Sequence, residues 1–145
     1  MAAFVYKFEN VKKAKDELKK KVQKDLALVE NEIFLCKQDL ESSLEELIEL
    51  RNSLNAKDLK VSEIQFNKGC EKLMEKKIES QKDMLNGLEV KKTKVLDELL
   101  QKTKEHKIFN TLEDNLREKF IKEQNRLEMK DLDEIAVQKF VRHES

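Results

Sequence analysis

Apolar residues recur at every third or fourth position from Val11 to Leu54 without interruption. The mean spacing is about 3.6 residues, the period of a long helix that buries one narrow face. The pattern predicts a helix from about Phe4 to Leu54 with only weak supercoiling. The members of this first stripe are Val11, Ala14, Leu18, Val22, Leu26, Val29, Ile33, Cys36, Leu40, Leu44, Leu47, Leu50 and Leu54.

The pattern breaks over residues 55–62, which we interpret as a turn. Ser62 followed by Gln65 fits a capping box, in which the serine oxygen accepts an amide hydrogen bond and the glutamine side chain reaches back. A second helix is therefore expected from about residue 63 to 141. A connection this short favours antiparallel neighbouring helices.

A second stripe follows, again with steps of three or four. Its members are Cys70, Met74, Ile78, Gln81, Leu85, Leu88, Lys92, Val95, Leu99, Lys102, His106, Phe109, Leu112, Leu116 and Phe120. Folding the chain at Asp58–Leu59 places Cys36 opposite Lys82 and Phe4 near Asp114. Leu40, Leu44 and Leu47 should face the region from Cys70 to Ile78.

These stripes predict an all-α fold, a long two-helix antiparallel coiled coil that forms a single hairpin domain over residues 1–145. The second helix is expected to be longer and to overhang the first beyond about Leu116, giving a rod with one protruding end.

The stretch LEMKDLDEIAVQKF lies in this overhang and changes the phase of the stripe, with a step of five from Leu127 to Leu132. A stripe that changes face where its partner helix ends predicts a different partner; fraying, or folding back on the rod, is the alternative. The candidate partner-binding residues are Met129, Leu132, Ile135, Ala136 and Phe140 for apolar contact, and Asp133 and Glu134 for orientation by basic groups.

Charged residues make up 41% of the chain and there is no proline, which is typical of long helices. The formal net charge of zero disfavours a bulk nucleic-acid binder. No apolar run approaches the roughly 18 residues of a membrane span, and the N-terminus lacks the features of a secretory signal, so we expect a cytosolic protein. Lysines concentrate in residues 12–24 and carboxylates in residues 30–49, either as a solvated face or as a basic end for an acidic surface.

Catalytic patterns are not found: the sequence has no glycine-rich phosphate loop, GxSxG or HExxH. We therefore expect no enzyme activity, no cofactor and no metal. Cys36 and Cys70 are expected to be free thiols that the register keeps apart. His106 is interpreted as a residue of the stripe.

The two ends of the chain resemble a known family. The opening YKFENVKKAKDEL and the C-terminal motif are similar to the flagellar export protein FliJ family. The motif positions are Glu128, Lys130, Leu132, Asp133, Glu134, Ala136 and Phe140.

This resemblance implies a soluble component of the flagellar type III export apparatus, and hence of motility. It implies a stalk, similar to the coiled coil of the rotary ATPase gamma subunit, that links the export ATPase ring to the membrane export gate and assists the handling of export chaperones. It also implies a cytoplasmic protein held peripherally at the inner face of the membrane at the flagellar base. The alternatives are a generic coiled-coil chaperone or scaffold, a rotary ATPase stalk, and the virulence-type secretion counterpart.

Overall fold

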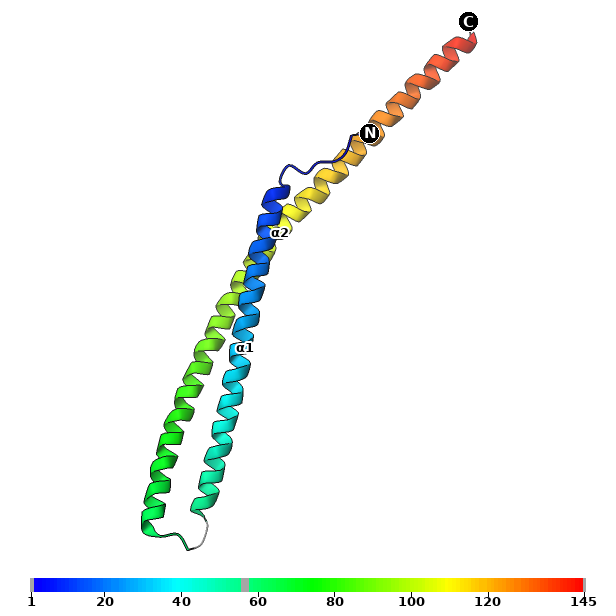
Figure 1. The fold of residues 1–145 in the computed structure, drawn as a ribbon. Helices are drawn as coiled ribbons and strands as arrows, with labels where there is room; N and C mark the ends of the chain where they lie inside the picture. Colours follow the sequence, from blue (N-terminus) through cyan, green and yellow to red (C-terminus); the bar gives the residue numbers. More distant parts are fainter. Residues whose placement is uncertain (1, 56–57, 145) are drawn as a thin grey trace. The chain divides into compact units, whose positions relative to one another are not determined.

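The computed structural model describes residues 2–55 and 58–144, and these contain two α-helices and no strand. Helix α1 spans Glu9–Leu54 and α2 spans Val61–Glu144, with 46 and 84 residues (Figure 1). They form an antiparallel helical hairpin with a longer second helix, which confirms the predicted fold class. Two residues of the expected turn, 56 and 57, lie outside the described residues.

The helix boundaries differ from those expected at the two N-terminal ends. Helix α1 begins at Glu9 rather than near Phe4, because the preceding residues are mostly aromatic or β-branched and lose side-chain freedom in a helix. Helix α2 begins at Val61, where the Lys60 amide donates to the Glu63 carboxylate at 3.4 Å. The cap is therefore centred on Lys60 and Glu63, and the expected Ser62 capping box is wrong. Asp58 has a φ of 76°, the left-handed conformation that aspartate tolerates in turns.

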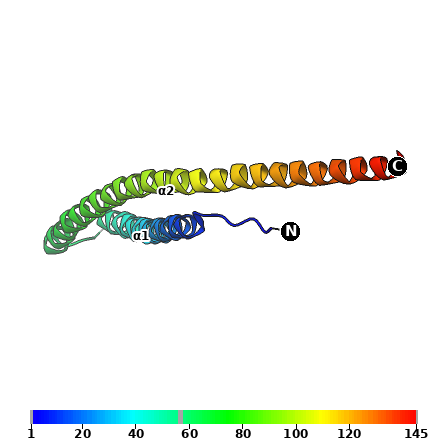
Figure 2. The same cartoon turned by 90° about the horizontal axis from the view of Figure 1, so that it is seen from above.

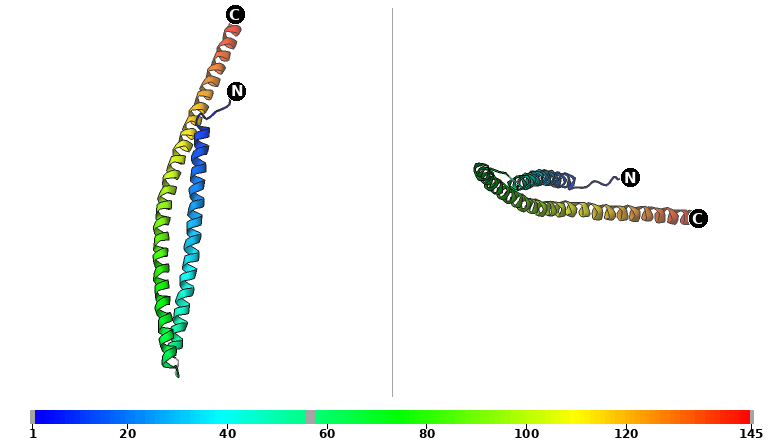
Figure 3. Two further views of the ribbon diagram at one scale, coloured as in Figure 1. Left: turned by 60° about the vertical axis from the view of Figure 1, so that its left-hand side comes forward. Right: turned by 90° about the horizontal axis from the view of Figure 1, so that it is seen from below.

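Contacts divide the chain into two compact units, Lys20–Leu100 and Met1–Lys19 with Gln101–Ser145. In the first unit, the two helices run antiparallel on either side of the connection (Figure 3). Arg51 pairs with Glu71 at 3.0 Å, and the Cys36 Sγ atom lies 3.7 Å from the Gln81 carbonyl oxygen. Cys36 therefore sits within one residue of the expected register. That the whole chain is one domain stays a prediction.

The second predicted stripe is confirmed throughout, since every member from Cys70 to Phe120 is buried or half-buried. The first stripe needs a correction. The buried and half-buried residues of α1 from Val22 to Leu50 follow alternating steps of four and three, a mean of 3.5 rather than 3.6, which is the coiled-coil heptad and implies more supercoiling than expected. The heptad has two buried positions. Val22, Val29, Cys36 and Ser43 occupy one of them, and Ile33 and Leu47 occupy the other.

The heptad places Ser43, not Leu44, in the interface. Ser43 is 2% exposed whereas Leu44 is 38% exposed, because a step of seven from Cys36 ends on residue 43. Leu44 and Leu47 nonetheless line one surface hollow together with Ile78, as the fold-back register predicted.

In the unit formed by Met1–Lys19 and Gln101–Ser145, charged residues form the α1 side of the interface. Continuing the heptad backwards gives Lys12, Lys15 and Lys19, which are half-buried. The expected stripe members Val11, Ala14 and Leu18 are exposed instead. The polar interface pairs Lys12 with Glu113, Lys15 with Glu105 at 3.2 Å, and Asp16 with His106 at 3.8 Å.

Candidate partner-binding surface

All seven predicted partner-binding residues are exposed on α2. Met129 and Leu132 are each 61% exposed and Phe140 is 63% exposed. Among residues 121–143, the half-buried Gln124 is the one exception to full exposure. In Figure 2 this part of α2, coloured orange to red, continues as helix past the N-terminal segment.

Helix geometry brings five of the seven residues onto one face. Steps of three and four connect Met129 to Leu132, Ala136 and Phe140, and Asp133 lies among them. We define the distal face as Met129, Leu132, Asp133, Ala136 and Phe140. Ile135 flanks this face on one side and Glu134 lies beyond its other edge, so those two do not join it.

The distal face points away from the side of α2 that is covered within the same unit. Phe120 is covered by Phe4, whose ring centroid lies 5.6 Å away. Met129 follows Phe120 by nine residues, about two and a half helical turns at 3.6 residues per turn. The distal face is therefore on roughly the opposite side of α2, which gives a structural reason for the change of phase after Leu127.

Two apolar residues beside the distal face were missed by the sequence analysis. Val137 is 61% exposed and Val141 is 58% exposed. They follow Asp133 by four and eight residues, a spacing that shows they share one side of the helix. Val137 also lines a shallow groove with Lys130, Asp133, Glu134 and Gln138. The apolar area is therefore broader than the motif indicated.

The charge around the distal face is negative. Between residues 128 and 134 there are four carboxylates and one lysine. On the N-terminal side of this segment, Arg126 and Glu123 form an ion pair at 2.6 Å. The hydrogen bond from Arg126 lowers the pKa of the Glu123 carboxyl. The acidic segment itself is left to attract basic groups on a partner.

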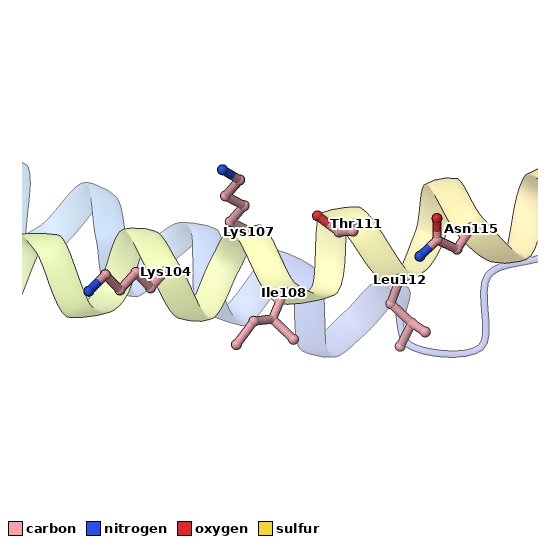
Figure 4. Close-up of a pocket in the computed structure, with 6 residues that line it drawn as sticks. All are labelled: Lys104, Lys107, Ile108, Thr111, Leu112 and Asn115. Carbon is pink, nitrogen blue, oxygen red and sulfur yellow. The ribbon is translucent and has the colours of Figure 1, made fainter.

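A second hollow lies nearer the middle of α2 and is shown in Figure 4. It is lined by Lys104, Lys107, Ile108, Thr111, Leu112 and Asn115. Ile108 and Leu112 extend to the same side of the helix, while Lys107 and Thr111 extend to the other. All six residues belong to one helix, so the hollow is an open surface rather than an enclosed site for a small molecule.

An aromatic cluster near the start of α1 was also missed. Tyr6 is 7% exposed, and its hydroxyl donates to the Phe109 carbonyl oxygen at 2.7 Å. Burial raises the pKa of the Tyr6 phenol above its usual 10.0. Phe8 lies 6.4 Å from Phe109 between ring centroids. The signal that was available is the run FVYKF, in which three aromatic residues alternate with others.

A family model described as Flagellar FliJ protein matches residues 4–145. The chain belongs to the FliJ family. The resemblance found at the two ends is thereby confirmed, and this FliJ family member is a component of the flagellar protein export apparatus. No curated protein and no solved structure matches the chain.

Within residues 2–55 and 58–144, no three His, Cys, Asp or Glu side chains are grouped so as to hold a metal ion. Across the same described ranges, no helix has the length and apolarity needed to cross a bilayer.

Proposed function

We propose that this FliJ family member is a non-catalytic stalk that links the export ATPase ring to the membrane export gate and assists the handling of export chaperones. One observation carries the proposal: a family member of the export apparatus presents an exposed apolar face at the distal end of α2. Such a face costs free energy in water and is favourable when it is covered by a partner.

The distal face is the proposed docking element. An amphipathic helix docks by laying anchors at three- and four-residue steps into an apolar groove. Met129, Leu132 and Phe140 have this spacing and the size to act as anchors. Asp133 and Glu134, with Ile135 on the flank, orient the helix against basic groups at the rim of the partner groove.

The location follows from the partners. The protein works in the cytoplasm and is held peripherally at the inner face of the membrane, at the flagellar base, by its contacts with the ATPase and the gate. The family match is to a flagellar protein, which favours the flagellar apparatus over the virulence-type counterpart.

Binding measurements with purified partners test the docking role. Leu132→Ala and Phe140→Ala should each weaken binding to the export ATPase, or to the cytoplasmic domain of the export gate, by about tenfold or more. Leu127→Ala is the matched control, because Leu127 is an exposed apolar residue of the same segment on another side of α2. Equal affinities for wild type, Leu132→Ala and Phe140→Ala would overturn the proposal.

A further inference from the structure

Residues 2–8, which we call the strap, lie along α2 as non-helical chain (Figure 3). Side chains attach the strap to α2. The Tyr6 hydroxyl donates to the Phe109 carbonyl oxygen, the Phe4 ring packs against Phe120, and the Phe8 ring lies near Phe109. An extended chain spans about 3.3 Å per residue against 1.5 Å in a helix, so Phe4 reaches Phe120 rather than the expected Asp114.

The side of α2 beneath the strap is built to receive a helix. Phe109, Leu116 and Phe120, which we call the covered face, are half-buried and continue the spacing of the α1 interface. Phe109 and Leu116 are seven residues apart, and Phe120 follows Glu113 by seven. Helix α1 begins at Glu9 and leaves this end of the interface to the strap.

The strap is only partly buried: Tyr6 is buried and Phe4 and Phe8 are half-buried, whereas residues 2, 3, 5 and 7 are exposed. Val5 is 82% exposed, and Phe4 lies beneath the Arg117 guanidinium at 5.0 Å from the ring centroid. Segments with few buried contacts open locally far more often than the whole protein unfolds. While it is in place, the strap contacts Phe109 and Phe120 and so keeps these two large apolar side chains of α2 from forming an exposed patch.

We propose that the strap is a displaceable cover, and that an amphipathic helix of an export-apparatus partner takes its place on the covered face. The occupant has apolar residues at alternating steps of three and four, because the covered face continues the heptad register of α1. Arg117 needs no new carboxylate there, because its guanidinium is already paired with the Glu113 carboxylate of the same helix at 3.2 Å. The inference rests on the proposed function for the source of the partner, but it concerns a different side of α2 from the distal face.

Tyr6 provides a direct reporter, since it is the single tyrosine of the chain. Full-length protein labelled with 3-fluorotyrosine gives one ¹⁹F signal for the strap. Unlabelled export ATPase, or the cytoplasmic domain of the export gate, is then added. We expect the signal of bound protein to move to the position of a solvent-exposed tyrosine.

Variants of the strap test whether displacement limits binding. Phe4→Ala removes the contacts with Phe120 and Arg117, so the open form becomes more populated and the partner should bind about three- to tenfold more tightly. Val5→Ala is the matched control in the same segment and should leave the affinity unchanged, because Val5 is exposed. Unchanged helicity by circular dichroism establishes that both variants are folded.

The outcomes separate this inference from the proposed function. Binding that leaves the Tyr6 signal at its buried position, or that Phe4→Ala weakens, overturns strap displacement alone. Absence of binding by wild type and by Phe4→Ala overturns both the strap displacement and the docking role proposed for the distal face.

Discussion

At the scale of single residues, neighbouring side chains of α1 have unequal roles in the interface. Leu47 is 6% exposed and Leu44 is 38% exposed, although both were expected to be buried. Leu47 belongs to the heptad series of Ile33. The other heptad series runs from Cys36 to Ser43, so Leu44 lies one residue outside the interface. The effect of a truncation should therefore depend on the position within the heptad rather than on residue type.

This difference can be measured with two matched substitutions. Leu47→Ala should lower the free energy of unfolding by about 2 kcal/mol or more, because it removes buried methyl groups from the interface. Leu44→Ala should cost less, about 1 kcal/mol, because Leu44 is already 38% exposed to water. Urea denaturation followed by circular dichroism measures both. Equal losses would mean that the interface runs along another side of α1.

At the scale of the elements, the sequence predicts the α2 side of the interface better than the α1 side near Glu9. All fifteen members of the α2 stripe were predicted correctly, because eleven of them are apolar and their spacing carries the pattern through the four polar members. In α1 the hydrophobic pattern indicated Val11 and Leu18, but the interface continues through Lys12 and Lys15, since ion pairs with α2 replace apolar contact there. A pattern of hydrophobicity cannot detect an interface made of charges.

The strap and the distal face illustrate the same limit in different ways. The strap from Phe4 onward was predicted as helix, because its tertiary contacts with Phe109 and Phe120 cannot be derived from local sequence. The distal face was indicated by its shift in phase, but membership of Ile135 and Glu134 could be judged only from the helix geometry.

Helix α2 should tolerate loss of its distal end as far as folding is concerned. Truncation after Lys122 removes a segment in which residues 123–143 are exposed apart from the half-buried Gln124, so the melting temperature should change by no more than a degree or two. Thermal denaturation of the truncated and full-length proteins tests this. A much lower melting temperature would show that the distal segment is part of the folded core rather than a docking element.

At the scale of the whole molecule, the two units are stabilised by different physical means. The unit Lys20–Leu100 buries aliphatic residues such as Val22, Val29 and Ile78. The unit that contains both termini relies on aromatic contacts and on carboxylates held by lysines. The hydrogen bond from Lys12 lowers the pKa of Glu113, and that from Lys15 lowers the pKa of Glu105.

These lowered pKa values predict that the second unit loosens first in acid. A carboxylate with a lowered pKa contributes stability above its ordinary pKa of 4.5, and this contribution is lost as the pH falls through the lower value in the folded protein. The near-ultraviolet circular dichroism of Tyr6 should therefore decline on acidification before the helical signal at 222 nm does. Glu113→Gln, which retains a hydrogen-bonding side chain without the charge, should reduce the acid dependence of the Tyr6 signal. Simultaneous loss of both signals in the wild type would contradict the assignment, because it would show that the ion pairs of Glu113 and Glu105 do not hold this unit separately from the aliphatic one.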